Sequence, residues 1–129
     1  MGSVTPLYAA IIALTFVLLS IRTLRLRRRF AVAIGDGEQP LLARAARAHA
    51  NFAEYVPITL LLIYFLEVGG VPITWIHALC GTLLVARLVH AYGISQVDEN
   101  HRYRVTGMAL TFTTIISSSL MIVAAPLTS

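Results

Sequence analysis

Four stretches of this chain are apolar enough to sit in lipid, and they restrict its fold more than any other feature. They cover residues 5–24, 41–66, 71–92 and 104–125. The hydrocarbon core of a bilayer is about 30 Å thick, and a helix needs roughly 20 residues to cross it. Only 12% of the residues are charged, whereas soluble domains have roughly 25%. We therefore predict an all-α, integral membrane four-helix bundle that forms a single domain over residues 1–129.

The basic residues predict the orientation of the bundle. All ten are arginines, and they gather in or beside the first and third connections: Arg22, Arg25, Arg27, Arg28, Arg29, Arg44, Arg47, Arg87, Arg102 and Arg104. Because basic residues are enriched in cytoplasmic loops, we expect both connections to be cytoplasmic. Both termini and the 67–71 turn are then expected on the opposite side. Basic residues follow the first apolar stretch instead of preceding it, so we expect a helix there and no cleaved signal peptide.

Several functional classes are disfavoured by the composition. The net charge of +4 fits this topology and attraction to anionic lipid headgroups. No basic groove with interleaved aromatic residues is evident, so we expect no nucleic-acid partner. The only cysteine, Cys80, lies in an apolar stretch and is expected to be a small buried residue. The histidines are scattered, at His49, His77, His90 and His101, and we expect no metal site. Asp98 and Glu99 are expected to be solvated loop charges.

Prolines, glycines and small residues indicate where the helices begin, bend and pack. Pro40 suits the first turn of the second helix. Pro57 leaves the carbonyl of Ala53 without its usual helical partner and is expected to bend that helix. Gly93 is expected to cap the third helix. The three serines at 117–119 permit close packing of the fourth helix against a neighbour.

A polar stripe follows the first half of the second helix. Steps of three and four residues place Arg44, Arg47, Asn51, Glu54 and Tyr55 on one helical face. A charged side chain in the bilayer is costly, so Glu54 needs a partner, for which Arg87 and Arg104 are the candidates.

Other polar residues are expected at the same level of the membrane, namely His90, Tyr92 and Tyr103. We predict a wet, arginine-rich pocket near the cytoplasmic interface, lined by the second, third and fourth helices. Its donors suit an anion with several carboxylates, and Glu54 suits an amino group. The alternative is that the stripe only holds helices together and the arginines only set the topology.

The second-helix stretch resembles the signature of the MAPEG family, the membrane-associated proteins in eicosanoid and glutathione metabolism. The matching residues in "RAARAHANFAEYVP" are Arg47, Asn51, Glu54, Tyr55 and Pro57. Four spans and an arginine-rich first connection fit the family as well. The resemblance implies a homotrimer of four-helix subunits that binds glutathione between neighbouring subunits near the cytoplasmic face.

The resemblance also implies roles for single residues. Arg47, Asn51, Glu54 and Tyr55 would bind glutathione, and Arg104 would stabilise its thiolate, with Arg102 as the fallback. A catalytic arginine of the first helix in some members could correspond to Arg27 or Arg28. Further candidates for the binding site are Arg28, Arg87 and His90. The chain departs from members with tyrosines at the end of the third helix, because His90 lies near one such place and Tyr92 is offset.

The implied activity is a membrane-bound glutathione transferase or peroxidase that acts on lipophilic electrophiles. Glutathione would be the co-substrate, and the reaction would form a thioether or reduce a lipid hydroperoxide. One alternative is a non-catalytic membrane scaffold or binding protein of the same fold. A small multidrug-type transporter is the second alternative, but residues 5–24 lack the acidic residue on which that class usually relies for proton coupling.

Overall fold

The computed structural model describes residues 2–125 and contains four helices over that range. They are α1 (Thr5–Phe30), α2 (Pro40–Val68), α3 (Ile73–Ser95) and α4 (His101–Ala124). All four are long and apolar enough to cross a membrane. Within the described residues there is no strand, and the predicted all-α four-helix fold is confirmed.

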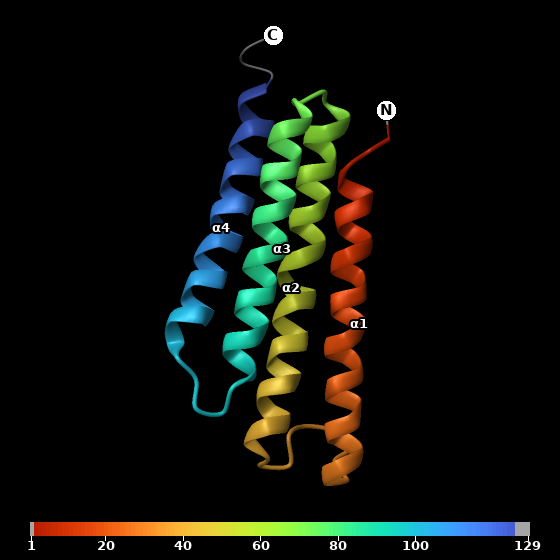
Figure 1. Cartoon of the computed structure of the whole chain (residues 1–129), viewed down its shortest axis with the longest axis vertical. Helices are drawn as coiled ribbons and strands as arrows, with labels where there is room; N and C mark the ends of the chain where they lie inside the picture. Colours follow the sequence, from red (N-terminus) through yellow and green to blue (C-terminus); the bar gives the residue numbers. More distant parts are fainter. Residues whose placement is uncertain (1, 126–129) are drawn as a thin grey trace.

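The helices run side by side and alternate in direction, with α1 and α4 at the two sides of the bundle (Figure 1). One end of the bundle, which we call the arginine end, contains the α1–α2 connection (31–39) and the α3–α4 connection (96–100). The other end, which we call the turn end, contains the α2–α3 turn (69–72). Short connections between consecutive helices make them antiparallel neighbours.

Apolar side chains of α1, α2 and α3 form the core. Ile12, Phe52, Ile63 and Leu83 are among its buried members. Cys80 is fully buried in this cluster, as the sequence predicts. In a membrane, burial of this kind adds van der Waals packing and little hydrophobic driving force, because lipid tails are as apolar as these side chains.

Most helix boundaries differ from the predicted ones by a few residues, and the largest differences are at the end of α1 and the start of α4. α1 continues six residues past 24 through the arginine-rich segment to Phe30, because arginine favours helix and no glycine occurs between residue 24 and Gly35. It ends where Ala31 adopts a left-handed conformation (φ 54°) and donates its N–H to the last carbonyls.

α4 begins at His101 and not at 104, because the Asn100 side chain accepts the Arg102 N–H as an N-cap. α2 starts at Pro40 and continues through Pro57 as one helix; the bend at Pro57 stays a prediction.

The prediction that Gly93 caps α3 is wrong. Gly93 lies inside the helix, which continues to Ser95. A Cβ at Gly93 would lie 2.7 Å from the Tyr103 Cβ and 2.9 Å from the Arg104 backbone nitrogen. Gly107 has the same role from the α4 side, where a Cβ would lie 2.7 Å from the Ala86 carbonyl oxygen. These two glycines let the backbones of α3 and α4 approach closely. Ser118 is also fully buried, in line with the small residues predicted there.

α1 is attached to the rest of the bundle near both of its ends. At the turn end, the Glu67 carboxylate accepts the backbone N–H groups of Val4 and Thr5, which lie at the start of α1. A carboxylate there satisfies two of the free N–H groups and complements the helix dipole. Towards the arginine end, Arg22 donates to the Ser95 hydroxyl (2.6 Å) and carbonyl (3.3 Å).

Candidate functional site

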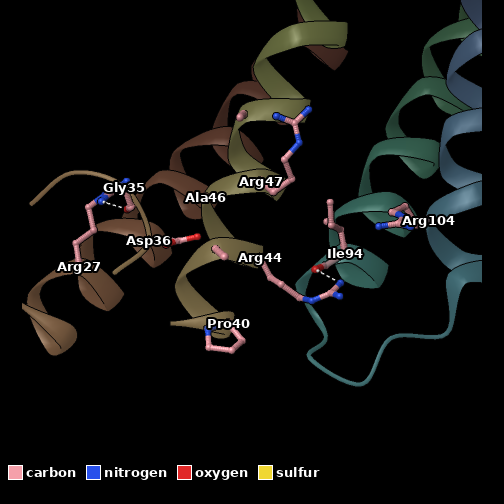
Figure 2. Close-up of a pocket in the computed structure, with 11 residues that line it drawn as sticks. Arg27, Gly35, Asp36, Pro40, Arg44, Ala46, Arg47, Ile94 and Arg104 are labelled. Atoms are coloured by element: carbon pink, nitrogen blue, oxygen red, sulfur yellow. Dashed lines mark hydrogen bonds between the residues drawn. The ribbon is translucent and has the colours of Figure 1, made fainter. Parts of the chain in front are cut away.

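A hollow of about 680 Å³ opens at the arginine end of the bundle. Its lining comes from all four helices and from the α1–α2 connection (Figure 2). Four arginines and one acid are among the lining residues: Arg27, Arg44, Arg47, Arg104 and Asp36. We call this the arginine hollow. An arginine-rich hollow therefore lies between the three predicted helices, and α1 and the α1–α2 connection also contribute to it.

The α1–α2 connection is folded against this hollow by its glycines and by Arg27. Gly35 and Gly37 have φ values of 74° and 57°, in the left-handed region that glycine adopts without strain. Arg27 donates to the Gly35 carbonyl oxygen at 2.8 Å, a contact visible in Figure 2. The glycine-rich "GDGEQP" indicates a loop in the sequence, but its place in the site depends on the fold.

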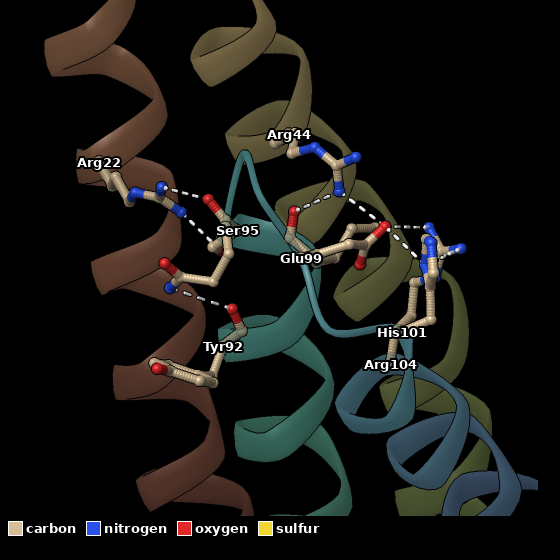
Figure 3. Close-up of polar contacts among 9 residues, drawn as sticks. Arg22, Arg44, Tyr92, Ser95, Glu99, His101 and Arg104 are labelled. Carbon is tan, nitrogen blue, oxygen red and sulfur yellow. Dashed lines mark hydrogen bonds and ion pairs between the residues drawn. The ribbon is translucent and has the colours of Figure 1, made fainter.

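Glu99 lies at the centre of an ionic cluster behind the hollow (Figure 3). One of its carboxylate oxygens, Oε1, lies 2.8 Å from Arg44 Nη1 and 3.0 Å from Arg104 Nη1. His101 Nδ1 lies 3.2 Å from the same oxygen. The Glu99 side chain is only 3% exposed, so the prediction of a solvated loop charge is wrong. Two arginines on different helices gather around the Glu99 carboxylate and bury it.

The hydrogen bond from Arg44, together with the nearby Arg104, holds the pKa of the Glu99 carboxyl below its ordinary value of 4.5. A lowered folded pKa means that Glu99 contributes stability above pH 4.5, and that this stability is lost as the pH falls through the folded pKa. We therefore expect the melting temperature of the wild type to fall more steeply than that of Glu99→Gln between about pH 5 and pH 3. Asp98→Asn, which changes the exposed neighbour, is the matched control and should follow the wild type. Parallel curves for wild type and Glu99→Gln would contradict this role of Glu99.

The polar stripe on α2 divides into an exposed part and a buried part. Arg47 Nη2 and Glu54 Oε2 are 3.0 Å apart, and both side chains are about half exposed. The prediction that Arg87 or Arg104 is the partner of Glu54 is therefore wrong within this chain, because Arg47 on the same helical face reaches Glu54 across two turns. Tyr55 lies partly buried against Phe112 of α4, with ring centroids 5.6 Å apart.

Arg87 and His90 lie in the protein core and do not line the arginine hollow. Arg87 is fully buried and donates through Nη2 to the Asn51 Oδ1 at 2.6 Å. His90 is also buried, with its Nδ1 3.4 Å from Arg87. Asn51 is 8% exposed, so it sits between the core and the exposed Arg47–Glu54 pair.

The structure thus brings together only some of the predicted site residues. Arg47 and Arg104 line the arginine hollow. Glu54 does not line it but forms an ion pair with Arg47. Arg28 lines a separate hollow of about 290 Å³ with Leu24 and Val32, whereas Arg27, the other first-helix candidate, lines both.

The polar stripe and the four spans have counterparts in known proteins. The family model described as "MAPEG family" matches residues 5–124. The inner membrane protein YecN of Escherichia coli strain K12 is 39% identical over 114 residues, covering 88% of this chain and 85% of that protein. YecN of Escherichia coli O6:H1 strain CFT073 matches with the same identity and coverage. No solved structure matches the chain at a significant level. This chain is therefore an integral, multi-pass membrane protein of the MAPEG family.

Proposed function

We propose that this MAPEG protein is a membrane-bound glutathione-dependent transferase or peroxidase that acts on lipophilic electrophiles. The observation that carries the proposal is the excess of positive charge at the arginine hollow, whose lining contains four arginines and one acid, Asp36. Glu99 and Glu54 pair with three of these arginines, so four positive charges meet three negative ones. Glutathione has two carboxylates, one ammonium group and a thiol, so its net charge opposes that of the hollow. Arginine binds carboxylates well because its planar guanidinium can donate two parallel hydrogen bonds.

Activation of the thiol requires a fixed positive charge close to the sulfur. A free thiol has a pKa of about 8.5, so only a few per cent is thiolate at neutral pH. Lowering that pKa by about two units takes roughly 2.7 kcal/mol of preferential interaction with the thiolate. Arg104 is proposed to supply this interaction. It cannot act as a base, because its guanidinium stays protonated.

Either reaction then follows from the thiolate. In conjugation, the sulfur forms a bond to an electrophilic carbon, and a leaving group departs with the electron pair. In peroxide reduction, the sulfur attacks a hydroperoxide oxygen and releases the alcohol after protonation, and a second glutathione then yields the disulfide and water. The protein lowers the barrier by holding the anion in place and by stabilising its charge.

A furrow between α1 and α2 supports the choice of a lipophilic electrophile. It has a volume of about 370 Å³, and its lining residues are apolar: Ala9, Ile12, Ala13, Phe16, Phe52, Ala53, Val56, Pro57 and Leu60. We call this the apolar furrow. A further hollow lies between the two, since it shares Arg27, Ala46 and Ala50 with the arginine hollow. Its His49 stacks on Phe16 of the apolar furrow, with ring centroids 4.7 Å apart. These three neighbouring hollows support the approach of an apolar molecule from the bilayer towards the arginines.

The proposal includes a homotrimer with glutathione between subunits near the cytoplasmic face. The arginine end is proposed to be cytoplasmic, because the arginines gather in or towards its two connections, except Arg87, which the structure buries in the core. A second candidate function is binding without catalysis. One observation favours it, namely that the Arg104 guanidinium is already paired with Glu99.

A binding experiment tests the proposed function. Millimolar reduced glutathione is expected to raise the melting temperature of the detergent-solubilised protein, since a ligand at about 100 times its Kd stabilises by roughly 2.7 kcal/mol. Arg47→Gln removes an arginine of the hollow and should weaken the shift. Arg25→Gln removes an exposed arginine outside the hollow and should leave it unchanged.

Native mass spectrometry of the same samples reads the oligomeric state and the glutathione stoichiometry. Trimers with bound glutathione are expected. No shift and no bound glutathione at millimolar concentration would refute the glutathione site, whereas a shift without turnover of any lipophilic electrophile would favour the binding protein.

A further inference from the structure

We propose that Arg87 is a positioning residue that fixes the orientation of the Asn51 amide. In this orientation Asn51 offers its NH2 group to the glutathione site and so recognises an oxygen atom of the ligand, and not its ammonium group. The inference rests on the proposed function. It gives the buried Arg87 a role, and it specifies that Asn51 acts as a hydrogen-bond donor to the ligand.

The contact between the two side chains determines which end of the amide faces inward. Arg87 Nη2 lies 2.6 Å from the Asn51 side-chain oxygen. A guanidinium has only donors, so an amide that faces it must present its oxygen. If the amide turned over, its NH2 group would meet N–H donors, and the oxygen would lose its partner. The orientation of the amide therefore follows from hydrogen-bonding chemistry.

The surroundings of Arg87 make this restraint strong. The side chain is fully buried, and its other polar neighbours are uncharged or weak acceptors. They are Thr111 Oγ1 at 3.4 Å, His90 Nδ1 at 3.4 Å and Met108 Sδ at 3.7 Å. Among the described residues its Nε has no hydrogen-bond partner. A buried cation with few acceptors depends on each one that it has, and the Asn51 oxygen is the closest.

Asn51 connects this buried cation to the exposed part of the polar stripe. It is 8% exposed and shares a helical face with Arg47 and Glu54. With its oxygen turned inward, the group left for a ligand is a donor. The stripe then offers donors from Arg47 and Asn51 to ligand oxygens and one acceptor, Glu54, to an ammonium group. This polarity matches a peptide-like ligand that has both carboxylates and an amine.

The decisive variant is Asn51→Asp, which keeps the size of the side chain and replaces the NH2 group with a second oxygen. The carboxylate pairs with Arg87, so the melting temperature of the ligand-free protein is expected to rise. The Kd for reduced glutathione is expected to increase by about 10–100-fold, since the donor is lost and an acceptor faces the ligand oxygen.

Thr111→Asp is the matched control for charge. It places a carboxylate beside the same guanidinium from α4 and leaves the Asn51 amide intact, so the Kd should stay close to that of the wild type.

A second pair of variants tests Arg87 directly and remains informative if Asn51→Asp does not fold. Arg87→Lys keeps a side chain that can only donate, so most of the affinity should remain. Arg87→Gln can donate or accept and no longer fixes the amide, so the Kd should increase by about tenfold. Equal Kd values for the Lys and Gln variants would overturn the restraint.

Isothermal titration of the detergent-solubilised protein with reduced glutathione separates the remaining outcomes. Unchanged or tighter binding by Asn51→Asp, with normal binding by the wild type, would overturn the inference alone, because Asn51 would then accept from the ligand or not contact it. A wild type that binds no glutathione would overturn the proposed function and this inference with it.

Discussion

Replacing Arg104 with alanine is expected to lower the rate of glutathione-dependent turnover by roughly 10²–10³-fold, the usual loss when one preorganised charge-stabilising donor is removed. Arg104 lines the arginine hollow and lies 3.0 Å from Glu99, so its guanidinium is held in place before the ligand arrives. Without it, bound glutathione is expected to stay mostly as the thiol at neutral pH.

Two measurements check this result. Ultraviolet difference spectra report the thiolate of bound glutathione, and stopped-flow assays with a lipophilic electrophile report turnover. Arg102→Ala is the matched control, because its exposed side chain lies two residues away and outside the hollow. An Arg104→Ala variant that keeps the thiolate spectrum would contradict the assignment. Loss of the spectrum in Arg102→Ala alone would transfer the role to Arg102.

A second large effect is expected from Gly107→Ala, which should destabilise the fold by about 1–3 kcal/mol or more through overpacking. The new methyl group would lie 2.6 Å from the His90 Cβ and 2.7 Å from the His90 backbone nitrogen. Because these atoms belong to α3 and include its backbone, which cannot yield like a flexible side chain, α3 and α4 must move apart. Gly93→Ala is expected to act in the same direction and to displace the backbone of Arg104 as well.

Gly81→Ala provides the control for this prediction. Its Cβ would meet only the Tyr8 hydroxyl, at 4.0 Å, so the alanine should be neutral or stabilising by up to about 1 kcal/mol through helix propensity. Thermal denaturation in one detergent would compare the three variants. A Gly107→Ala protein as stable as Gly81→Ala would show that α3 and α4 are not in close contact at this point.

Sequence patterns predicted the parts of this molecule that depend on local spacing and on solvation. Four long apolar stretches give four helices, because a backbone in lipid must satisfy its own hydrogen bonds. The start of α2 at Pro40 agrees with the preference of proline for the first helical turn. The arginine hollow was expected because topology places the arginines of distant segments at one end of the bundle.

What could not be predicted depends on which side chains meet across helices. Glu99 is next to Asp98 in a polar connection, and only the fold shows that arginines of α2 and α4 bury it. Glu54 pairs with Arg47 along its own helix because both are exposed there, whereas Arg87 extends into the core. Gly93 looks like a helix end in the sequence, since its packing role depends on the approach of α4.

The two attachments of α1 restrict how an apolar molecule can enter between α1 and α2. Glu67 holds the start of α1 at the turn end, and Arg22 holds it to Ser95 towards the arginine end. Among the described residues, α1 packs on α2 and α3 but not on α4. Because α1 is held at both of these points, we expect it to move outward only between them, where the apolar furrow lies. If the proposed function holds, we therefore expect slender, flexible electrophiles to be better substrates than broad, rigid ones.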